Sequence, residues 1–418
     1  MRENKFLPIH ELIMSVAQAT KIVDKAVFNH HEQVAYSAMK LSQKLNYKDE
    51  DCHNLLVAAL LHDIGMFTIA NKIDLLKFEY KHTKHADIGA SLLEKYPFFP
   101  EAASIIRYHH LAWQNGQGKY FEGDPVPAES HLLHLVDRVS LMIDDSSNVL
   151  DQKKGVINYL EERTPNIFKE SHLEALKEMQ DDFWFSLINP FVMKAELENE
   201  LSRYEKPMTK KQSMDLAKFY SKIIDYRSKF TSTHSLGVAK TSRHLASKLG
   251  WPKEELDDME LAGYLHDLGK LAIPSEILNK NGSLSESEYN LIKSHTYHTY
   301  HILNPIKIKK IDKIKRWAAN HHEHLDGSGY PFGLSSDKLC TGSRVMMVAD
   351  KFTALTEDRP YRKGMPQKQV TNILNDLTDL GKIDKDIVNL LLEDYNSFDY
   401  MRAEIQNNRK KEYSKIVN

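Results

Sequence analysis

Apolar side chains recur along this chain at spacings of three and four residues, which is typical of helices with one buried face. Few segments alternate between apolar and polar residues as half-buried strands do. Glycine is scarce, at 17 of 418 residues, as expected of helices joined by short loops. Runs with the helical spacing include Ala35, Met39, Leu41 and Leu45; Val238, Leu245 and Leu249; and Ile373, Leu374 and Leu377. The pattern predicts an all-α fold.

The apolar pattern occurs twice, in phase with the same chemically active residues. We align the two copies on His30 and His234, each of which is followed by Val-Ala four residues later and by leucines after eleven and fifteen residues. Each copy reaches a His-Asp pair 32 residues after its first histidine, namely His62-Asp63 and His266-Asp267. An identical gap to the same dipeptide indicates that two domains share one fold.

The repeat continues with a single histidine, a His-His pair and an aspartate. The His-His pair follows the single histidine after 24 residues in the first copy and 26 in the second, and the aspartate follows after 27 and 28 more. Each copy therefore contains seven candidate metal ligands: His30, His62, Asp63, His85, His109, His110 and Asp137 in the first, and His234, His266, Asp267, His295, His321, His322 and Asp350 in the second.

The two copies set the expected domain organisation. Between them, roughly residues 150–208 are charged and predicted to be helical, with Pro190 and Pro207 as candidate breaks. We therefore expect one domain over residues 1–205 and a second over residues 206–418.

Five imidazoles and two carboxylates in a helical core point to bound metal, because buried polar groups need partners and divalent ions provide them. Neighbouring residues on a helix point about 100° apart, so a His-Asp pair suits two ions, with the histidine on one ion and the aspartate bridging both. Two ions roughly 3.5–4 Å apart can activate water and hold a phosphoryl group. Nitrogen and oxygen donors together favour Mn, Fe, Zn, Co or Ni over Mg or Ca.

Charge and composition exclude several classes of protein. Lys and Arg number 56 against 58 Asp and Glu, a net charge of −2, which argues against a surface for polymeric nucleic acid. The apolar run 55–61 is too short to span a bilayer, and the N-terminus leads into no signal-peptide core. Two cysteines, Cys52 and Cys340, exclude a disulfide framework. We expect a cytoplasmic protein with no membrane partner.

The second copy contains four further motifs within about residues 210–385: His-Asp-Leu-Gly-Lys at 266–270, His-His-Glu-His-Leu-Asp-Gly-Ser-Gly-Tyr-Pro at 321–331, Val-Ala-Asp-Lys-Phe-Thr-Ala-Leu-Thr at 348–356, and Arg-Pro-Tyr-Arg at 359–362. On these motifs the second copy resembles the HD-GYP family within the HD superfamily of metal-dependent phosphohydrolases. The resemblance implies a helical bacterial phosphodiesterase that opens cyclic dinucleotides, chiefly cyclic di-GMP, at a centre of two or three metal ions.

The resemblance also implies roles for single residues. The seven residues of the second copy would be metal ligands, with Asp267 bridging the ions, and Lys270 would contact the scissile phosphate. Arg359 and Arg362 would hold substrate phosphates, and Tyr330 would shape the pocket beside the metals. Three further histidines lack a counterpart in the first copy, and we expect them either to support the metal ligands or to have structural roles: His298, His301 and His324.

The second copy departs from the family pattern at three positions. Members with three ions have a glutamate four residues before the first histidine, where this chain has Phe230, so we expect two ions. Thr299 replaces a usual glycine, and Thr353 replaces a common aspartate. These changes concern the shape of the pocket rather than the class of reaction.

The first copy resembles a plain HD domain. Met66 replaces the lysine, Leu111 replaces Glu323, and no Gly-Tyr-Pro loop follows, although all seven ligands remain, which implies a further metal site. Two interpretations stay open: a second phosphohydrolase acting on the phosphomonoester of the linear product, or a scaffold or sensor with an inherited site.

An HD domain followed by an HD-GYP domain, without a receiver or membrane module, is similar to bacterial phosphodiesterases that act on 3′,3′-cyclic GMP-AMP. We therefore expect this dinucleotide as substrate, with cyclic di-GMP as the next candidate. Another nucleotide phosphohydrolase and a cyclic-dinucleotide-responsive protein without turnover are the alternatives. The sequence leaves the oligomeric state open.

Overall fold

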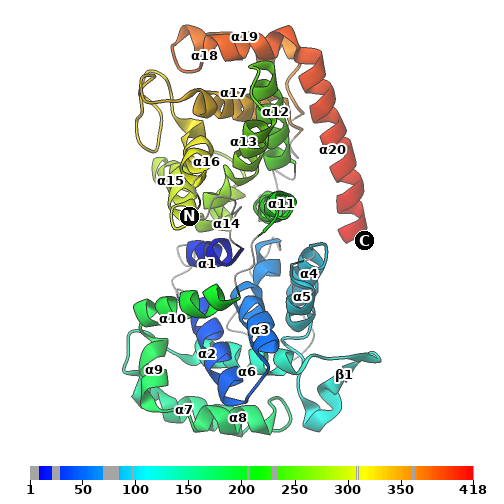
Figure 1. The fold of residues 1–418 in the computed structure, drawn as a ribbon, viewed down its shortest axis with the longest axis vertical. Helices are drawn as coiled ribbons and strands as arrows, with labels where there is room; N and C mark the ends of the chain where they lie inside the picture. Colours follow the sequence, from blue (N-terminus) through cyan, green and yellow to red (C-terminus); the bar gives the residue numbers. More distant parts are fainter. Residues whose placement is uncertain are drawn as a thin grey trace. The chain divides into compact units, whose positions relative to one another are not determined.

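The computed structural model describes residues 9–20, 29–68, 84–96, 98–204, 208–227, 233–306, 308, 310–358 and 363–417. Among these residues, the regular β-structure is one antiparallel hairpin of β1 (Tyr120–Phe121) and β2 (Asp124–Pro125). All other regular elements are helices (Figure 1), which confirms the predicted all-α fold. No helix in the described ranges has both the length and the apolar character needed to cross a bilayer.

Packing divides the described chain into two compact units, and the division along the sequence falls between α10 and α11. The N-terminal unit contains α1 (Ile9–Thr20), α2 (His30–Lys44), α3 (Asp49–Leu61), η2 (Ile64–Thr68), α4 (Lys84–Leu93), α5 (Pro100–Arg107), η3 (Gln114–Lys119), the hairpin, α6 (Ala128–Met142), α7 (Val149–Glu161), α8 (Glu170–Lys177), α9 (Asp181–Leu187) and α10 (Pro190–Arg203). The C-terminal unit contains α11 (Lys210–Arg227), α12 (His234–Lys248), α13 (Lys253–Leu265), η4 (Leu268–Ala272), α14 (Ser275–Leu278), α15 (Glu286–Leu303), α16 (Ile311–Ala319), η5 (Asn320–His322), α17 (Thr341–Thr356), α18 (Gln367–Asp379), α19 (Lys385–Glu393) and α20 (Tyr395–Val417).

The internal repeat is visible in the packing of the helices. In the N-terminal unit α2 packs on α3 and α6, and in the C-terminal unit α12 packs in the same way on α13 and α17. Likewise α4 packs on η2 and α5, as α15 packs on η4 and α16. The apolar positions that defined the repeat lie in these interfaces, since Val34, Leu41, Val238 and Leu245 are fully buried.

Local sequence explains where the repeated helices begin. Acidic side chains occupy the first turns of α3 and α13, where they interact favourably with the positive end of the helix dipole. Ser285 and Glu288 form a capping box at the start of α15. Between the two copies, α7 to α10 confirm the predicted helical segment, and Pro190 is the first residue of α10, a position that tolerates proline. Pro207 lies outside the described residues.

The His-Asp pair of each copy sits at a corner of the chain. The helices α3 and α13 end at Leu61 and Leu265, and the chain then turns into the short 3₁₀ helices η2 and η4. A glycine in the 3₁₀ helix after each corner allows this helix to approach the backbone of α4 in the first copy and of α15 in the second. A Cβ on Gly65 would lie 2.0 Å from the His85 carbonyl oxygen, and a Cβ on Gly269 would lie 1.9 Å from that of His295.

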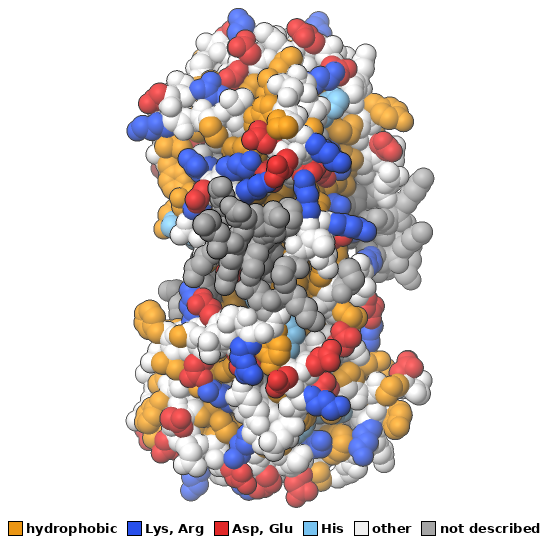
Figure 2. All heavy atoms as spheres, in the orientation of Figure 1, with side chains coloured by type: hydrophobic (Ala, Val, Ile, Leu, Met, Phe, Trp, Pro, Cys, Tyr) orange, Lys and Arg blue, Asp and Glu red, His pale blue; other side chains and the backbone are white. Residues whose placement is uncertain are grey.

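Basic and acidic side chains are mixed over the described surface of both units on the face drawn in Figure 2. This mixing agrees with the formal net charge of −2.

Candidate metal centres

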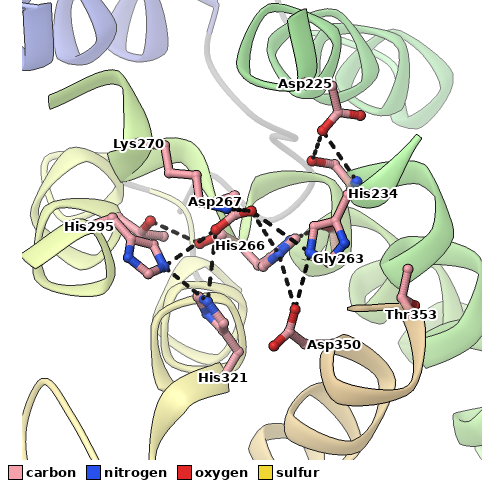
Figure 3. Close-up of polar contacts among 12 residues, drawn as sticks. Asp225, His234, Gly263, His266, Asp267, Lys270, His295, His321, Asp350 and Thr353 are labelled. Atoms are coloured by element: carbon pink, nitrogen blue, oxygen red, sulfur yellow. Dashed lines mark hydrogen bonds and ion pairs between the residues drawn. The ribbon is translucent and has the colours of Figure 1, made fainter. Parts of the chain in front are cut away.

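The seven predicted ligands of the second copy, here called the C-terminal cluster, converge from five parts of the chain. Figure 3 labels all of them except His322. Six of the seven residues are buried, and the His322 side chain is 26% exposed. The contributing parts are the start of α12, the corner after α13, the helix α15, the short helix η5 and the helix α17, which supply His234, His266 with Asp267, His295, His321 with His322, and Asp350.

The carboxylate of Asp267 lies between two pairs of imidazoles. Its Oδ2 atom is 3.3 Å from Nε2 of His266 and 3.9 Å from Nε2 of His234. Its Oδ1 atom is 3.3 Å from Nε2 of His295 and 3.9 Å from Nε2 of His321. One carboxylate therefore presents a different oxygen to each pair, which is the arrangement that a bridging ligand needs.

Asp350 completes the cluster from α17. Its Oδ1 atom lies 3.1 Å from Nε2 of His234 and 3.9 Å from Nε2 of His266, and its Oδ2 atom lies 3.9 Å from Nδ1 of His322. Asp267 and Asp350 thus share His234 and His266 as neighbours.

Backbone carbonyl groups orient three of the imidazoles. Nδ1 donates to the carbonyl oxygen three residues earlier in His266, His295 and His321, over 2.8, 2.6 and 2.7 Å. A carbonyl oxygen can only accept, so Nδ1 carries the proton and the neutral ring has its lone pair on Nε2, facing the cluster. Burial lowers the pKa of His295 to about 4 and that of His321 to about 3, so both rings are neutral at pH 7. Nε2 of His266 makes no hydrogen bond to the described residues, which fits a metal-binding nitrogen.

Glu357, which the sequence analysis did not identify, lies behind His234. Its Oε2 atom is 3.4 Å from Nδ1 of His234, and its Oε1 atom accepts a hydrogen bond from the hydroxyl of Thr233. Burial lowers the pKa of His234, but the carboxylates of Asp350 and Glu357 outweigh burial and raise it to about 10. The sequence feature that could have identified Glu357 is its position two helical turns after Asp350, at the end of α17.

Lys270 lies at the edge of the cluster, as Figure 3 shows. Its Nζ atom is 2.5 Å from Oδ2 of Asp267, and its side chain is 18% exposed. Burial raises the pKa of Asp267, but the neighbouring His266 and Lys270 outweigh burial and hold it well below its usual range. The carboxylate is therefore ionised at neutral pH.

A buried glutamate holds the Gly-Tyr-Pro loop beside the cluster. The Glu323 carboxylate accepts hydrogen bonds from the backbone N–H groups of Phe332 and Leu334, at 2.7 and 2.9 Å. The N–H of Tyr330 donates to the carbonyl oxygen of His322, and the two rings lie 5.0 Å apart between centroids. Gly327 has a φ of +80°, which glycine adopts without strain.

The residues that depart from the family pattern have defined partners where the structure describes them. The Thr299 hydroxyl donates to the His266 carbonyl oxygen and accepts from the Gly269 N–H, so it fastens the corner to α15. The Thr353 hydroxyl donates to the Ala349 carbonyl oxygen. Phe230, Arg359 and Arg362 lie outside the described ranges.

Two of the additional histidines contact residues other than the seven candidate ligands. The ring of His301 packs 4.2 Å from that of Tyr297, and Nδ1 of His324 lies 2.9 Å from the Ser328 hydroxyl in the loop. His298, on the neighbouring turn of α15, lies close to the glycine at the corner. A Cβ added to Gly269 would be 2.8 Å from the Cβ of His298.

The seven predicted residues of the first copy, the N-terminal cluster, also converge. Oδ2 of Asp63 lies 3.3 Å from Nε2 of His62 and 3.7 Å from Nε2 of His30, and Oδ1 lies 3.7 Å from Nε2 of His85. Oδ1 of Asp137 lies 3.3 and 3.7 Å from the same nitrogens of His30 and His62.

The paired histidines join the N-terminal cluster on the side of His85. Nε2 of His110 lies 3.1 Å from Nε2 of His85, and Nδ1 of His109 donates to the Ile106 carbonyl oxygen over 2.6 Å. The two clusters together contain four groups of three side chains whose donor atoms all lie within 4.8 Å of one another, so each group could hold a metal ion: His30, His62 and Asp63; His85, His109 and His110; His234, His266 and Asp267; and His295, His321 and His322.

The surroundings of the two clusters differ. In the N-terminal cluster, the buried guanidinium of Arg138 donates to Oδ2 of Asp137 over 2.5 and 3.1 Å. Nδ1 of His30 lies 2.9 Å from the Ser140 hydroxyl, which donates to Oε1 of Gln33. His30 therefore donates to a neutral hydroxyl, whereas its counterpart His234 faces the carboxylate of Glu357.

Comparisons with known proteins agree with the duplication. Models of the HD domain match residues 27–142 and residues 199–387. The chain is 30% identical over 412 residues to 3'3'-cGAMP-specific phosphodiesterase 1 of Vibrio cholerae serotype O1, covering 95% of this chain and 94% of the relative. It is 26% identical over 427 residues to 3'3'-cGAMP-specific phosphodiesterase 3 of the same organism, covering 90% and 92%.

Two further similarities concern the fold and the second copy. A crystal structure of the cyclic GMP-AMP specific phosphodiesterase V-cGAP3 of V. cholerae aligns with 93% of this chain and 98% of its own, at a TM-score of 0.64 and 20% identity, and so has the same fold. Cyclic di-GMP phosphodiesterase PA4108 of Pseudomonas aeruginosa is 36% identical over 136 residues, 32% of each chain. The extent of the first match and the HD-GYP motifs together show that the chain belongs to the HD-GYP family of metal-dependent phosphodiesterases, with an additional HD domain before the HD-GYP domain.

Proposed function

We propose that the C-terminal unit, as a domain of residues 206–418, hydrolyses a 3′–5′ phosphodiester bond of 3′,3′-cyclic GMP-AMP and releases a linear dinucleotide with a 5′-phosphate. The observation that carries this proposal is the identity of 30% over 95% of the chain to a 3'3'-cGAMP-specific phosphodiesterase. Cyclic di-GMP is the second candidate substrate, because the relative that is 36% identical over 136 residues is a cyclic di-GMP phosphodiesterase.

The C-terminal cluster would hold two divalent ions, with Asp267 between them. His234 and His266 face one oxygen of Asp267, and His295 and His321 face the other, while His322 lies beside Asp350. The mixed nitrogen and oxygen donors suit Mn, Fe, Ni, Co or Zn. When bound, such ions supply Lewis acidity to phosphoryl oxygens and lower the pKa of water.

The side chains around the cluster would bind and orient the substrate. The Lys270 ammonium, 2.5 Å from Asp267, would offset the negative charge that grows on the phosphoryl group in the transition state. The Tyr330 ring, which lies against His322, would provide a flat surface on which a nucleobase can stack. The family resemblance adds Arg359 and Arg362 as guanidinium groups for the phosphates.

A substrate panel tests this proposal. Full-length protein is stripped of metal, reconstituted separately with Mn²⁺, Fe²⁺, Co²⁺, Ni²⁺ and Zn²⁺, and incubated with cyclic GMP-AMP, cyclic di-GMP or cyclic di-AMP, and the products are separated by liquid chromatography. We expect the linear dinucleotide, with the highest kcat/KM for cyclic GMP-AMP. The H266A/D267A variant should lose ring opening.

The other outcomes identify the alternatives. A higher kcat/KM for cyclic di-GMP than for cyclic GMP-AMP would mean that cyclic di-GMP is the preferred substrate of the same reaction. Absence of a linear product with every metal would favour a protein that binds a cyclic dinucleotide without turnover. Hydrolysis of other nucleotides alone would favour a different HD phosphohydrolase.

A second activity is proposed for the N-terminal unit, as a domain of residues 1–205: removal of the 5′-phosphate from the linear product. The observation that favours it is the assembly of all seven candidate ligands in the N-terminal cluster, with Asp63 facing His30 and His62 through one oxygen and His85 through the other. Leu111 replaces the glutamate that holds the Gly-Tyr-Pro loop, so the second substrate would differ from the first.

Phosphate release separates the two activities. Linear dinucleotide with a 5′-phosphate is given to the full-length protein and to its H62A/D63A and H266A/D267A variants. Release should vanish in H62A/D63A, which should still open the ring of the cyclic substrate, and should persist in H266A/D267A. Phosphate release by H62A/D63A would show that the N-terminal cluster is not the site of this activity.

A further inference from the structure

The two copies differ in the residue that directly follows the first histidine of the repeat, which is His30 in one copy and His234 in the other. In the C-terminal unit this residue is Ser235, whose hydroxyl and N–H both donate to Oδ1 of Asp225 on α11, at 2.7 and 3.3 Å. This pair of bonds holds the first turn of α12 against α11. In the N-terminal unit the same position is His31, which places one more imidazole beside the anchor histidine His30.

The His31 ring faces the N-terminal cluster. Its Nε2 atom lies 3.8 Å from Oδ2 of Asp63, and its side chain is 11% exposed. The ring centroid lies 5.4 Å from the centroids of both His30 and His62. Nε2 atoms of three imidazoles therefore lie 3.3 to 3.8 Å from a single carboxylate oxygen.

The corresponding oxygen of the C-terminal cluster has a different set of neighbours. Oδ2 of Asp267 faces the two imidazoles of His234 and His266 and the ammonium of Lys270. Met66 occupies the lysine position in the N-terminal unit and has no charge to offer. On this side of the carboxylate, the C-terminal cluster thus has two imidazoles and a cation, whereas the N-terminal cluster has three imidazoles.

From this geometry we infer that His31 is a further nitrogen ligand of the N-terminal metal centre and makes that centre selective for ions that prefer imidazole. The inference rests on the proposal that the N-terminal cluster binds metal. Imidazole suits Zn, Fe and Ni, whereas carboxylate and water suit Mn, and Co²⁺ binds sites with nitrogen and oxygen donors more tightly than Mn²⁺ does. The two centres of one chain therefore differ in metal preference, and the N-terminal centre favours Zn²⁺ and Co²⁺ over Mn²⁺ more strongly than the C-terminal centre does.

Metal titration of the full-length chain tests this inference. The H266A/D267A background disables the C-terminal cluster, so that the N-terminal centre is observed in the stripped protein. Co²⁺ is followed by its visible absorption, and Zn²⁺ and Mn²⁺ by competition with a chelating indicator. The variant is H31S, which introduces the serine of the other copy, and H31Q is the second variant because its side chain is closer in size to histidine.

We expect both variants to lose affinity for Zn²⁺ and Co²⁺ by about tenfold or more, with a smaller loss for Mn²⁺ and an altered Co²⁺ absorption band, because a ligand nitrogen is missing. Circular dichroism and thermal unfolding identify a variant that fails to fold, and the folded one then decides. A loss of less than tenfold for Zn²⁺, or an equal loss for Zn²⁺ and Mn²⁺, would overturn the inference.

The failure of the underlying proposal has a separate signature. If the H266A/D267A protein with His31 intact binds none of the three ions, the N-terminal cluster is not a metal centre, and both statements fail. If it binds ions and the His31 variants bind them equally well, only the role of His31 is rejected.

Discussion

The ammonium of Lys270 lies 2.5 Å from Oδ2 of Asp267, the carboxylate oxygen that also faces His234 and His266. A fixed positive charge therefore borders the candidate metal centre of the C-terminal unit. The N-terminal unit has Met66 at the same position. This difference gives the chain its own control for the role of the lysine.

The K270M variant, which introduces the methionine of the other copy, should reduce kcat for ring opening by about 10²- to 10³-fold, because a preorganised charge at the reacting phosphoryl group is lost. Steady-state kinetics on the metal-reconstituted protein measure this effect, and KM should change much less than kcat. Metal content of the purified variant serves as the control. A kcat that falls only in proportion to lost metal would mean that Lys270 holds the centre together rather than acting on the substrate.

The E323L variant, which introduces the leucine found at 111 in the first copy, should raise KM and lower the melting temperature. Glu323 is 1% exposed and accepts two backbone N–H groups of the Gly-Tyr-Pro loop. Leaving each of them unpaired costs about 1–3 kcal/mol. Thermal unfolding and kinetics measure both effects, and E323Q, which can still accept hydrogen bonds, should be intermediate. An unchanged KM in E323L would separate the loop from substrate binding.

The E357Q variant should weaken metal binding at the C-terminal centre by about 10- to 100-fold, because a partner that orients His234 loses its charge. Titration is carried out in the H62A/D63A background, in which the C-terminal centre is observed. Asp144, seven residues after Asp137 as Glu357 is after Asp350, is exposed and bonds to Ser146 and Ser147. The D144N variant, titrated in the H266A/D267A background in which the N-terminal centre is observed, is therefore the matched control and should bind metal normally. Equal losses in both variants would contradict the role of Glu357.

Removal of metal with a chelator should lower the melting temperature of the full-length protein. Ions that bind only the folded state stabilise it by about 2.7 kcal/mol when their concentration is 100 times Kd. Differential scanning calorimetry with and without chelator measures the change. The D63A/D267A variant lacks the central carboxylate of both clusters, so the chelator should leave its melting temperature unchanged. A similar decrease in that variant would place the stabilising metal elsewhere.

The fold and the family could be predicted from the sequence because both depend on the spacing of residues along the chain. Helical spacing predicted the all-α fold, and the identical gap from His30 to His62 and from His234 to His266 predicted the duplication. The structure brings all fourteen candidate ligands of the two copies into two clusters. Their assignment to metal stays a prediction until metal binding is measured.

The residues around the clusters could not be identified in this way, because their roles depend on orientation rather than on spacing. Glu357 and Ser140 approach equivalent nitrogens of His234 and His30, yet they differ in chemistry and do not occupy equivalent positions in the repeat. His31 is separated from ordinary helical histidines only by the direction of its ring. Such contacts become visible only when the helices are packed.

The glycine after each His-Asp corner has a genetic consequence. Gly269 has no side chain that could bind metal, yet any side chain there would press against the backbone of His295 and push two halves of the ligand set apart. Gly65 has the same relation to His85. Inactivating mutations in this gene are therefore expected at the codons of Gly65 and Gly269, although neither glycine is a candidate metal ligand.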